Sequence, residues 1–282
     1  MGEKNKQRAK KSKKRKQRQM QSILLREKGI AQAKQFNLLS NVFISVVLND
    51  IPACQHVLRI ITGIDDLVVK EVRTQYHIAK ITSHDAVLDI LAEDGNGQLY
   101  NIEIQRSDTI DHARRTRFYG SMIDSEFLQK GKSYDKMPEV RIIYISETDI
   151  WKQGKTVYEV EKSFNGTDIP YDDGKHVTYV NAAVDDDTAI AKLMNYFKAA
   201  DPMDMSQGDL SKRVHYLKCE EGGLDIMCEI TNKIMEESKR EQARITSINL
   251  AKMGLSVEAI AKAVEMNVGL VRKWVKGVKK LA

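Results

Sequence analysis

The sequence predicts an α/β fold in which a mixed β-sheet is flanked by helices. Three observations lead to this prediction: apolar or alternating segments typical of strands, amphipathic segments typical of helices, and the order of the two kinds along the chain. A helical segment is followed by three strand-like segments, a second helical segment and a fourth strand-like segment. A helix between two strands supplies the crossover that parallel pairing needs, so the sheet is expected to be mixed.

The first of these elements is a helix that begins near Pro52. The fixed φ angle of proline suits a first helical turn, and Asn49 or Asp50 is placed to cap it. Gly63 provides a C-terminal stop. An earlier helical pattern begins at Gln21.

The remaining elements follow from alternation and from turn signals. The segment 139–146 is continuously apolar, which is typical of a strand buried on both faces. A pair of glycines, Gly222 and Gly223, is expected to break the last long helix. The expected strands are 67–74, 86–92, 99–105, 139–146 and 176–183, and the further expected helices are 109–131, 187–200 and 211–240.

Composition describes a globular protein with one main domain and appendages. The chain has 282 residues, of which 42% are hydrophobic and 30% charged. No apolar run approaches the ~20 residues needed to span a bilayer, so we expect no membrane partner. The three cysteines, Cys54, Cys219 and Cys228, form no framework of spacings, which favours a reducing, cytoplasmic location. The N-terminus lacks the apolar region of a secretory signal.

The net charge of +6 is unevenly distributed. Residues 1–20 carry +9 and residues 240–282 carry +6, so the remainder of the chain carries −9. Basic ends on an acidic body favour contact with a phosphate backbone, although a basic arm can also bind membranes or merely solubilise the chain. We expect residues 1–20 to be a disordered arm, because its like charges repel one another.

The hairpin formed by residues 86–105 carries the candidate catalytic residues. With a three-residue loop, Gly95-Asn96-Gly97, Asp89 faces Glu103 across the hairpin and Gln105 shares their face. Like charges in facing positions destabilise a hairpin unless a divalent cation binds between them. Two alternatives remain: a two-residue Asn-Gly turn would move Glu103 to the opposite face, and solvent-facing acids could simply be neutralised by Lys or Arg.

Two stretches of this region, "SHDAVLDILAEDGNGQLYNIEIQR" and "DHARRTRFYGSMIDSEFLQKGKSYDKMPEVRIIYISETDIW", resemble the PD-(D/E)XK nuclease family transposases, also called recombination-promoting nucleases. The resemblance covers roughly residues 40–240. It implies a restriction-endonuclease-like core (helix, three-stranded hairpin sheet, helix, strand) within a nuclease-like domain at 21–240. The family signature falls in order on Asp89, Glu103, Gln105, Arg115 and Tyr119.

The resemblance also implies a chemistry: Mg²⁺-dependent hydrolysis of DNA phosphodiester bonds, in a mobile-element or recombination setting. Asp89, Glu103 and the backbone carbonyl of Ile104 would hold Mg²⁺, for which Mn²⁺ can substitute, and Gln105 would orient a water. Arg115 would contact DNA phosphate, or form a surface salt bridge. An acid on the preceding helix often joins such sites; Asp50 is the candidate here, with Asp65 and Asp66 as alternatives.

The signature departs from the superfamily pattern at Gln105, where lysine is usual. A lysine can polarise the attacking water, whereas glutamine offers only a neutral amide, so the rate and the metal requirement are in doubt. A catalytically silent DNA-binding or regulatory protein with the nuclease scaffold is therefore the main alternative function. A structural protein whose hairpin acids lie on the surface is a further one. A nuclease that cuts both strands would favour a homodimer.

The C-terminal segment 241–282 resembles a helix-turn-helix. Ser256 and Asn267 are placed as caps of two successive helices. The second helix would present Arg272, Lys273 and Lys276 to DNA. The alternative is a small packing or oligomerising helical bundle whose lysines are solvated.

Overall fold

The computed structural model of the chain describes residues 20, 23–24, 26–79, 85–106, 111–128 and 130–278. The expected basic arm at 1–20 therefore lies, apart from Met20, outside the described residues. The chain divides into two compact units: one is formed by residues 35–223 and the other by 224–282 together with 1–34. Each unit is described by itself.

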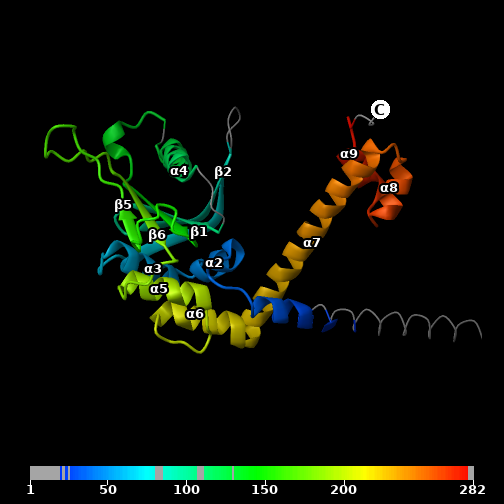
Figure 1. The fold of residues 1–282 in the computed structure, drawn as a ribbon, viewed down its shortest axis with the longest axis horizontal. Coiled ribbons are helices and arrows are strands. Elements are labelled where there is room, and N and C mark those ends of the chain that lie inside the picture. The colour runs from blue at the N-terminus through cyan, green and yellow to red at the C-terminus, as the bar shows by residue number, and fades with distance from the viewer. Residues whose placement is uncertain are drawn as a thin grey trace, which may run out of the picture. The chain divides into compact units, whose positions relative to one another are not determined.

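The unit formed by 35–223 is built on a six-stranded mixed sheet with the strand order β1-β2-β3-β4-β6-β5 (Figure 1). The pairs β1/β2, β2/β3 and β5/β6 are antiparallel, whereas β3/β4 and β4/β6 are parallel. The expected mixed α/β architecture is confirmed. The strands are β1 Val69–Ile78, β2 Ala86–Asp94, β3 Leu99–Gln105, β4 Val140–Ser146, β5 Val157–Glu159 and β6 Lys175–Asn181.

Helices cover both faces of this sheet (Figure 1). Helix α4 is the crossover between the parallel strands β3 and β4, and it lies on one face, while α2, α3, α5 and α6 lie on the other. No described helix is by itself long and apolar enough to cross a membrane. Helices α2 and α3, which are bent by 107° relative to each other, reach that length and apolar composition only when they are counted together. The helices are α2 Asn41–Leu48, α3 Ile51–Thr62, α4 His112–Phe127, α5 Ala189–Ala199 and α6 Gly208–Cys219, and a 3₁₀ turn spans Tyr134–Lys136.

Helix α3 begins and ends as its sequence predicts. The Asp50 carboxylate caps it by accepting a hydrogen bond from the backbone N–H of Ala53 at 3.1 Å. Gly63 ends it in the left-handed region, with a φ of 68°. These two local signals therefore account for both ends of this helix.

The β2–β3 hairpin has the three-residue loop on which the expected register depends. The backbone N–H of Asp94 donates to the carbonyl of Gln98 at 3.1 Å, closing the loop around Gly95–Gly97. Ile90 therefore pairs with Ile102, which is the register that places Asp89 opposite Glu103. Every residue of β3 is buried, so the alternative of solvent-facing acids is wrong.

The other unit contains the long helix α7, Glu221–Lys252, and the short helices α8, Val257–Ala263, and α9, Val268–Trp274. Ile260, Ala261 and Val271 form a small core of their own, against which the C-terminal end of α7 packs. Ser256 caps α8 through the N–H of Ala259, and Asn267 caps α9 through the N–H of Gly269, as the sequence predicts.

The break before α7 differs from the expected position. It falls at Glu220, which has an extended backbone, and Gly222 and Gly223 lie in the first turn of α7. A Cβ atom on Gly223 would stand 2.0 Å from the backbone oxygen of Tyr216. The glycine is therefore required for close packing at this corner and not as a helix breaker.

Candidate active site at the end of the β2–β3 hairpin

The candidate site lies where hydrogen bonds from side chains replace the backbone–backbone hydrogen bonds between β2 and β3. Beyond the Ile90–Ile102 pair, Asp89 Oδ2 accepts a hydrogen bond from the backbone N–H of Ile104 at 3.0 Å. In return, the backbone N–H of Asp89 donates to Glu103 Oε1 at 3.3 Å. Asp89 is 8% exposed and Glu103 is 4% exposed. Two carboxylates are thus held together at the interior of the sheet.

Asp89 is further held by Gln75, a residue that no pattern in the sequence singles out. Gln75 of β1 faces Asp89, since Thr74 and Tyr76 on either side of it pair with Ile90 and Leu88. Its Nε2 donates to Asp89 Oδ1 at 3.2 Å and to the hydroxyl of Ser45 at 3.1 Å. Gln75 has a φ of 51°, a region that non-glycine residues rarely adopt. The backbone at this position is therefore distorted where it supports Asp89.

Helix α2 therefore approaches the site through Ser45 and not through an acid. The carboxylate of Asp50, the residue expected to join the site, is used as the α3 cap. In the part of the chain that the structure describes, no group of three or more His, Cys, Asp or Glu side chains is placed to hold a metal ion. Among the residues that the structure describes, the acids that meet at the candidate site are Asp89 and Glu103.

On the other side of the carboxylates, α4 brings Arg115 to Gln105. Arg115 Nη1 donates to Gln105 Oε1 at 2.6 Å, and its Nη2 donates to the hydroxyl of Tyr119 at 3.0 Å. The guanidinium also lies 5.8 Å from the centre of the Tyr119 ring. Gln105 is 8% exposed, so its amide is sheltered from bulk water, whereas Arg115 and Tyr119 are half-buried. The structure therefore brings together all five residues on which the expected signature falls.

Burial governs the electrostatics of the two carboxylates. It raises the pKa of Glu103 from 4.5 to about 8, and the neighbouring charge of Asp89 acts in the same direction. Burial also raises the pKa of Asp89, partly offset by its hydrogen bonds from Ile104 and Gln75. The charge of Arg115 lowers the pKa of both acids. Without a further cation, this site therefore disfavours full ionisation of the pair.

Beneath α4, a layer of aromatic and hydroxyl side chains backs the site. Tyr144, which pairs with Glu103 across β3 and β4, lies with its hydroxyl 3.0 Å from Nδ1 of His112. The hydroxyl of Tyr179 lies 3.0 Å from that of Thr116. His112 and Thr116 are both buried, so these contacts fix the first turns of α4 on the sheet. They thereby fix the position of Arg115, which lies between them on α4.

A family model described as PD-(D/E)XK nuclease family transposase matches residues 58–181. This match confirms the resemblance. No curated protein and no solved structure matches the chain. The matched PD-(D/E)XK segment runs from α3 to the end of β6, so it contains Asp89, Glu103, Gln105 and Arg115 but neither Ser45 nor the C-terminal helices.

The PD-(D/E)XK match supports a function of the nuclease or transposase type, for which DNA is the implied substrate. Nucleases of this kind generally use divalent metals. The three basic residues expected to contact DNA, Arg272, Lys273 and Lys276, lie in the other compact unit, where all three are exposed.

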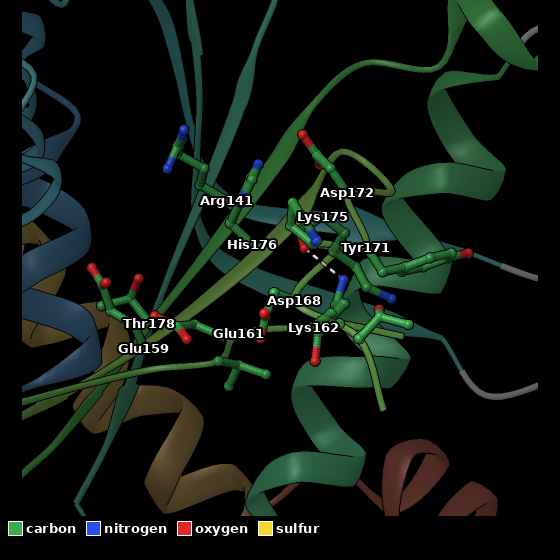
Figure 2. Close-up of a pocket in the computed structure, with 14 residues that line it drawn as sticks. Arg141, Glu159, Glu161, Lys162, Asp168, Tyr171, Asp172, Lys175, His176 and Thr178 are labelled. Atoms are coloured by element: carbon green, nitrogen blue, oxygen red, sulfur yellow. Dashed lines mark hydrogen bonds between the residues drawn. The ribbon is translucent and has the colours of Figure 1, made fainter. Parts of the chain in front are cut away.

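A separate cavity of about 580 Å³ lies elsewhere on the sheet (Figure 2). Arg141, His176 and Thr178 contribute to its lining from β4 and β6, and the loop after β5 contributes Asp168 and Lys162. Lys162 is already engaged with Asp173 and with the backbone carbonyl of Lys175. None of the residues that build the Asp89–Glu103 site lines this cavity.

Proposed function

We propose that this chain is a metal-dependent DNA endonuclease that hydrolyses phosphodiester bonds, in the setting of mobile elements or recombination. One observation carries the proposal: within the matched segment, Asp89 and Glu103 are buried side by side at the point where the β2–β3 ladder ends. A buried pair of carboxylates is costly in a purely structural role, because desolvation and mutual repulsion both oppose its ionisation.

The residues present fit Mg²⁺, with Mn²⁺ as a substitute. The donors would be the carboxylates of Asp89 and Glu103 and the backbone carbonyl of Ile104, and hard oxygen ligands of this kind suit both ions. Mg²⁺ is usually held by only one or two carboxylates, with waters and substrate phosphates completing its shell. A third acid such as Asp50 is therefore not required. When bound, the ion supplies charge stabilisation at the phosphate and lowers the pKa of a water.

The protein's own side chains would orient the reactants. The Gln105 amide, held by Arg115, would orient the attacking water from the same strand that carries Glu103. Arg115 would direct its remaining N–H groups to a DNA phosphate, since a guanidinium has five donors and only two of its hydrogen bonds are accounted for by Gln105 and Tyr119.

The C-terminal helices would contribute DNA binding. Helix α8 packs on α9 around Ile260 and Val271, and two short packed helices joined by a turn support the helix-turn-helix interpretation. Arg272, Lys273 and Lys276 are exposed along and just after α9, where phosphates can reach them, and Arg272 also pairs with Glu258 at 3.4 Å. A second candidate function is a silent nuclease scaffold that binds DNA without cutting it. The exposed basic residues would serve such a protein equally well, and the uncharged Gln105 favours it because lysine is usual at that position.

Cleavage of supercoiled plasmid separates the two functions. We expect wild-type protein to nick the plasmid with Mg²⁺ or Mn²⁺ and not in EDTA. Glu103→Gln should abolish nicking, whereas Glu139→Gln, which removes an exposed acid next to β4, should not. If neither wild type nor the Glu139→Gln variant cuts while both still shift DNA on a gel, the silent scaffold is the better account.

A further inference from the structure

We infer that Arg115 is a positioning residue: it orients the Gln105 amide and supplies the positive charge beside the Asp89–Glu103 pair. This role rests on the proposed function and adds to it separate roles for Gln105 and Arg115. A neutral side chain on β3 and a cation on α4 would together do what a single amino group at position 105 could do alone.

The orientation of the amide follows from hydrogen-bond chemistry. A guanidinium can only donate, so the 2.6 Å contact with Arg115 requires the carbonyl oxygen of Gln105 to face α4. The amide NH₂ is consequently turned away from the guanidinium. Because Gln105 is buried, the amide cannot exchange this bond for one with bulk water. Arg115 therefore holds the amide oxygen on the side of α4.

Arg115 is itself held in place from α4. Tyr119, four residues further along the helix, accepts a hydrogen bond from Nη2 and lies with its ring beneath the guanidinium. The neighbouring arginines Arg114 and Arg117 are exposed, whereas Arg115 is half-buried. Of these three arginines on α4, Arg115 is thus the one that contacts Gln105, two residues from Glu103 on β3, and its charge lowers the pKa of both carboxyls.

Transferring the positive charge from Arg115 to position 105 tests whether the two residues together replace a lysine. Four variants are compared with wild type: Arg115→Gln, Gln105→Lys, the double variant that combines them, and Arg117→Gln. The last removes the same charge from the same helix at an exposed position. Each protein is measured twice, as the melting temperature in EDTA and as the rate of single-turnover DNA cleavage with Mg²⁺.

We expect Arg115→Gln to lower the melting temperature in EDTA and to slow cleavage about a hundredfold, the scale of losing one charge-stabilising donor at a reacting centre. Gln105→Lys alone should also lower the melting temperature, because it places two cations side by side. The double variant should recover the melting temperature and most of the cleavage rate lost in Arg115→Gln. Arg117→Gln should leave the melting temperature unchanged.

The inference is overturned if the double variant is no better than Arg115→Gln in either measurement, since the charge would then not be exchangeable between the two positions. It is also overturned if Arg117→Gln lowers the melting temperature as much as Arg115→Gln does. Failure of wild-type protein to cut DNA with any metal would contradict the proposed function instead. In that case the melting temperatures in EDTA still show whether the positive charge of Arg115 stabilises the Asp89–Glu103 pair.

Discussion

Replacing Glu103 by its neutral isostere should stabilise the metal-free protein, and increasingly so as the pH rises. The carboxyl of Glu103 is 4% exposed and its pKa is raised from 4.5 to about 8 by burial and by the charge of Asp89. The folded protein therefore binds this proton more tightly than the unfolded chain does. Stability is lost as the pH rises from about 4.5 through about 8, and the loss is complete above that window.

The size of the effect follows from the same values. At about 1.4 kcal/mol per pH unit, a rise from 4.5 to about 8 corresponds to about 5 kcal/mol of free energy of unfolding. Water entering the metal-free site offsets part of this, and we expect about 3 kcal/mol. Glu103→Gln retains an oxygen that can accept from the backbone N–H of Asp89 and removes the charge. The variant should therefore be more stable than wild type at high pH and similar to it near pH 4.5.

Urea denaturation in EDTA, at a series of pH values, measures this difference directly. Glu139→Gln serves as the matched control, because it removes an exposed carboxylate and should show no comparable pH-dependent gain. The reasoning is refuted if the difference between Glu103→Gln and wild type is the same at both ends of the pH range. It is equally refuted if the variant is the less stable protein at high pH.

Three further predictions concern other parts of the chain. Asp50→Ser keeps a capping oxygen for α3, so it should change the free energy of unfolding by less than about 0.5 kcal/mol and leave plasmid cleavage intact; loss of cleavage with stability retained would place Asp50 in the site. Combined alanine substitution of Arg272, Lys273 and Lys276 should reduce the slope of log DNA affinity against log salt by about 3, as measured by fluorescence anisotropy, and an unchanged slope would argue for a packing role. Gly223→Ala should cost about 3 kcal/mol in urea denaturation because its Cβ meets backbone, whereas Gly222→Ala meets only the movable Tyr216 hydroxyl and should cost less; equal costs would contradict the close packing at this corner.

The features predicted well from the sequence are those that depend on a few neighbouring residues. Caps at Asp50, Ser256 and Asn267 were recognisable because each side chain satisfies a backbone N–H only two or three residues away. The hairpin register followed from the loop length, which fixes every facing pair. With the three-residue loop these rules place Asp89 opposite Glu103. The sequence left open the choice between that loop and an Asn-Gly turn, and the hydrogen bond from Asp94 to Gln98 decides it.

The parts of the site that escaped prediction depend on contacts between distant segments. Ser45 and Gln75 are ordinary polar residues in sequence, and their link to Asp89 exists only because α2 packs against β1 and β2. Strand β5 is only three residues long and follows no alternating pattern that could reveal it. At the break at Glu220, likewise, Gly223 lies against the backbone of Tyr216, a close approach that the pair of glycines in the sequence does not reveal.

The measurement that tests the central claim most directly is the binding of Mn²⁺ to metal-free protein, followed by the electron paramagnetic resonance signal of the free ion. If Asp89 and Glu103 hold the divalent cation, wild type and Glu139→Gln should deplete the free-ion signal, and Glu103→Gln should leave it largely unchanged. Equal depletion by all three proteins would contradict the assignment of the metal site to the β2–β3 hairpin.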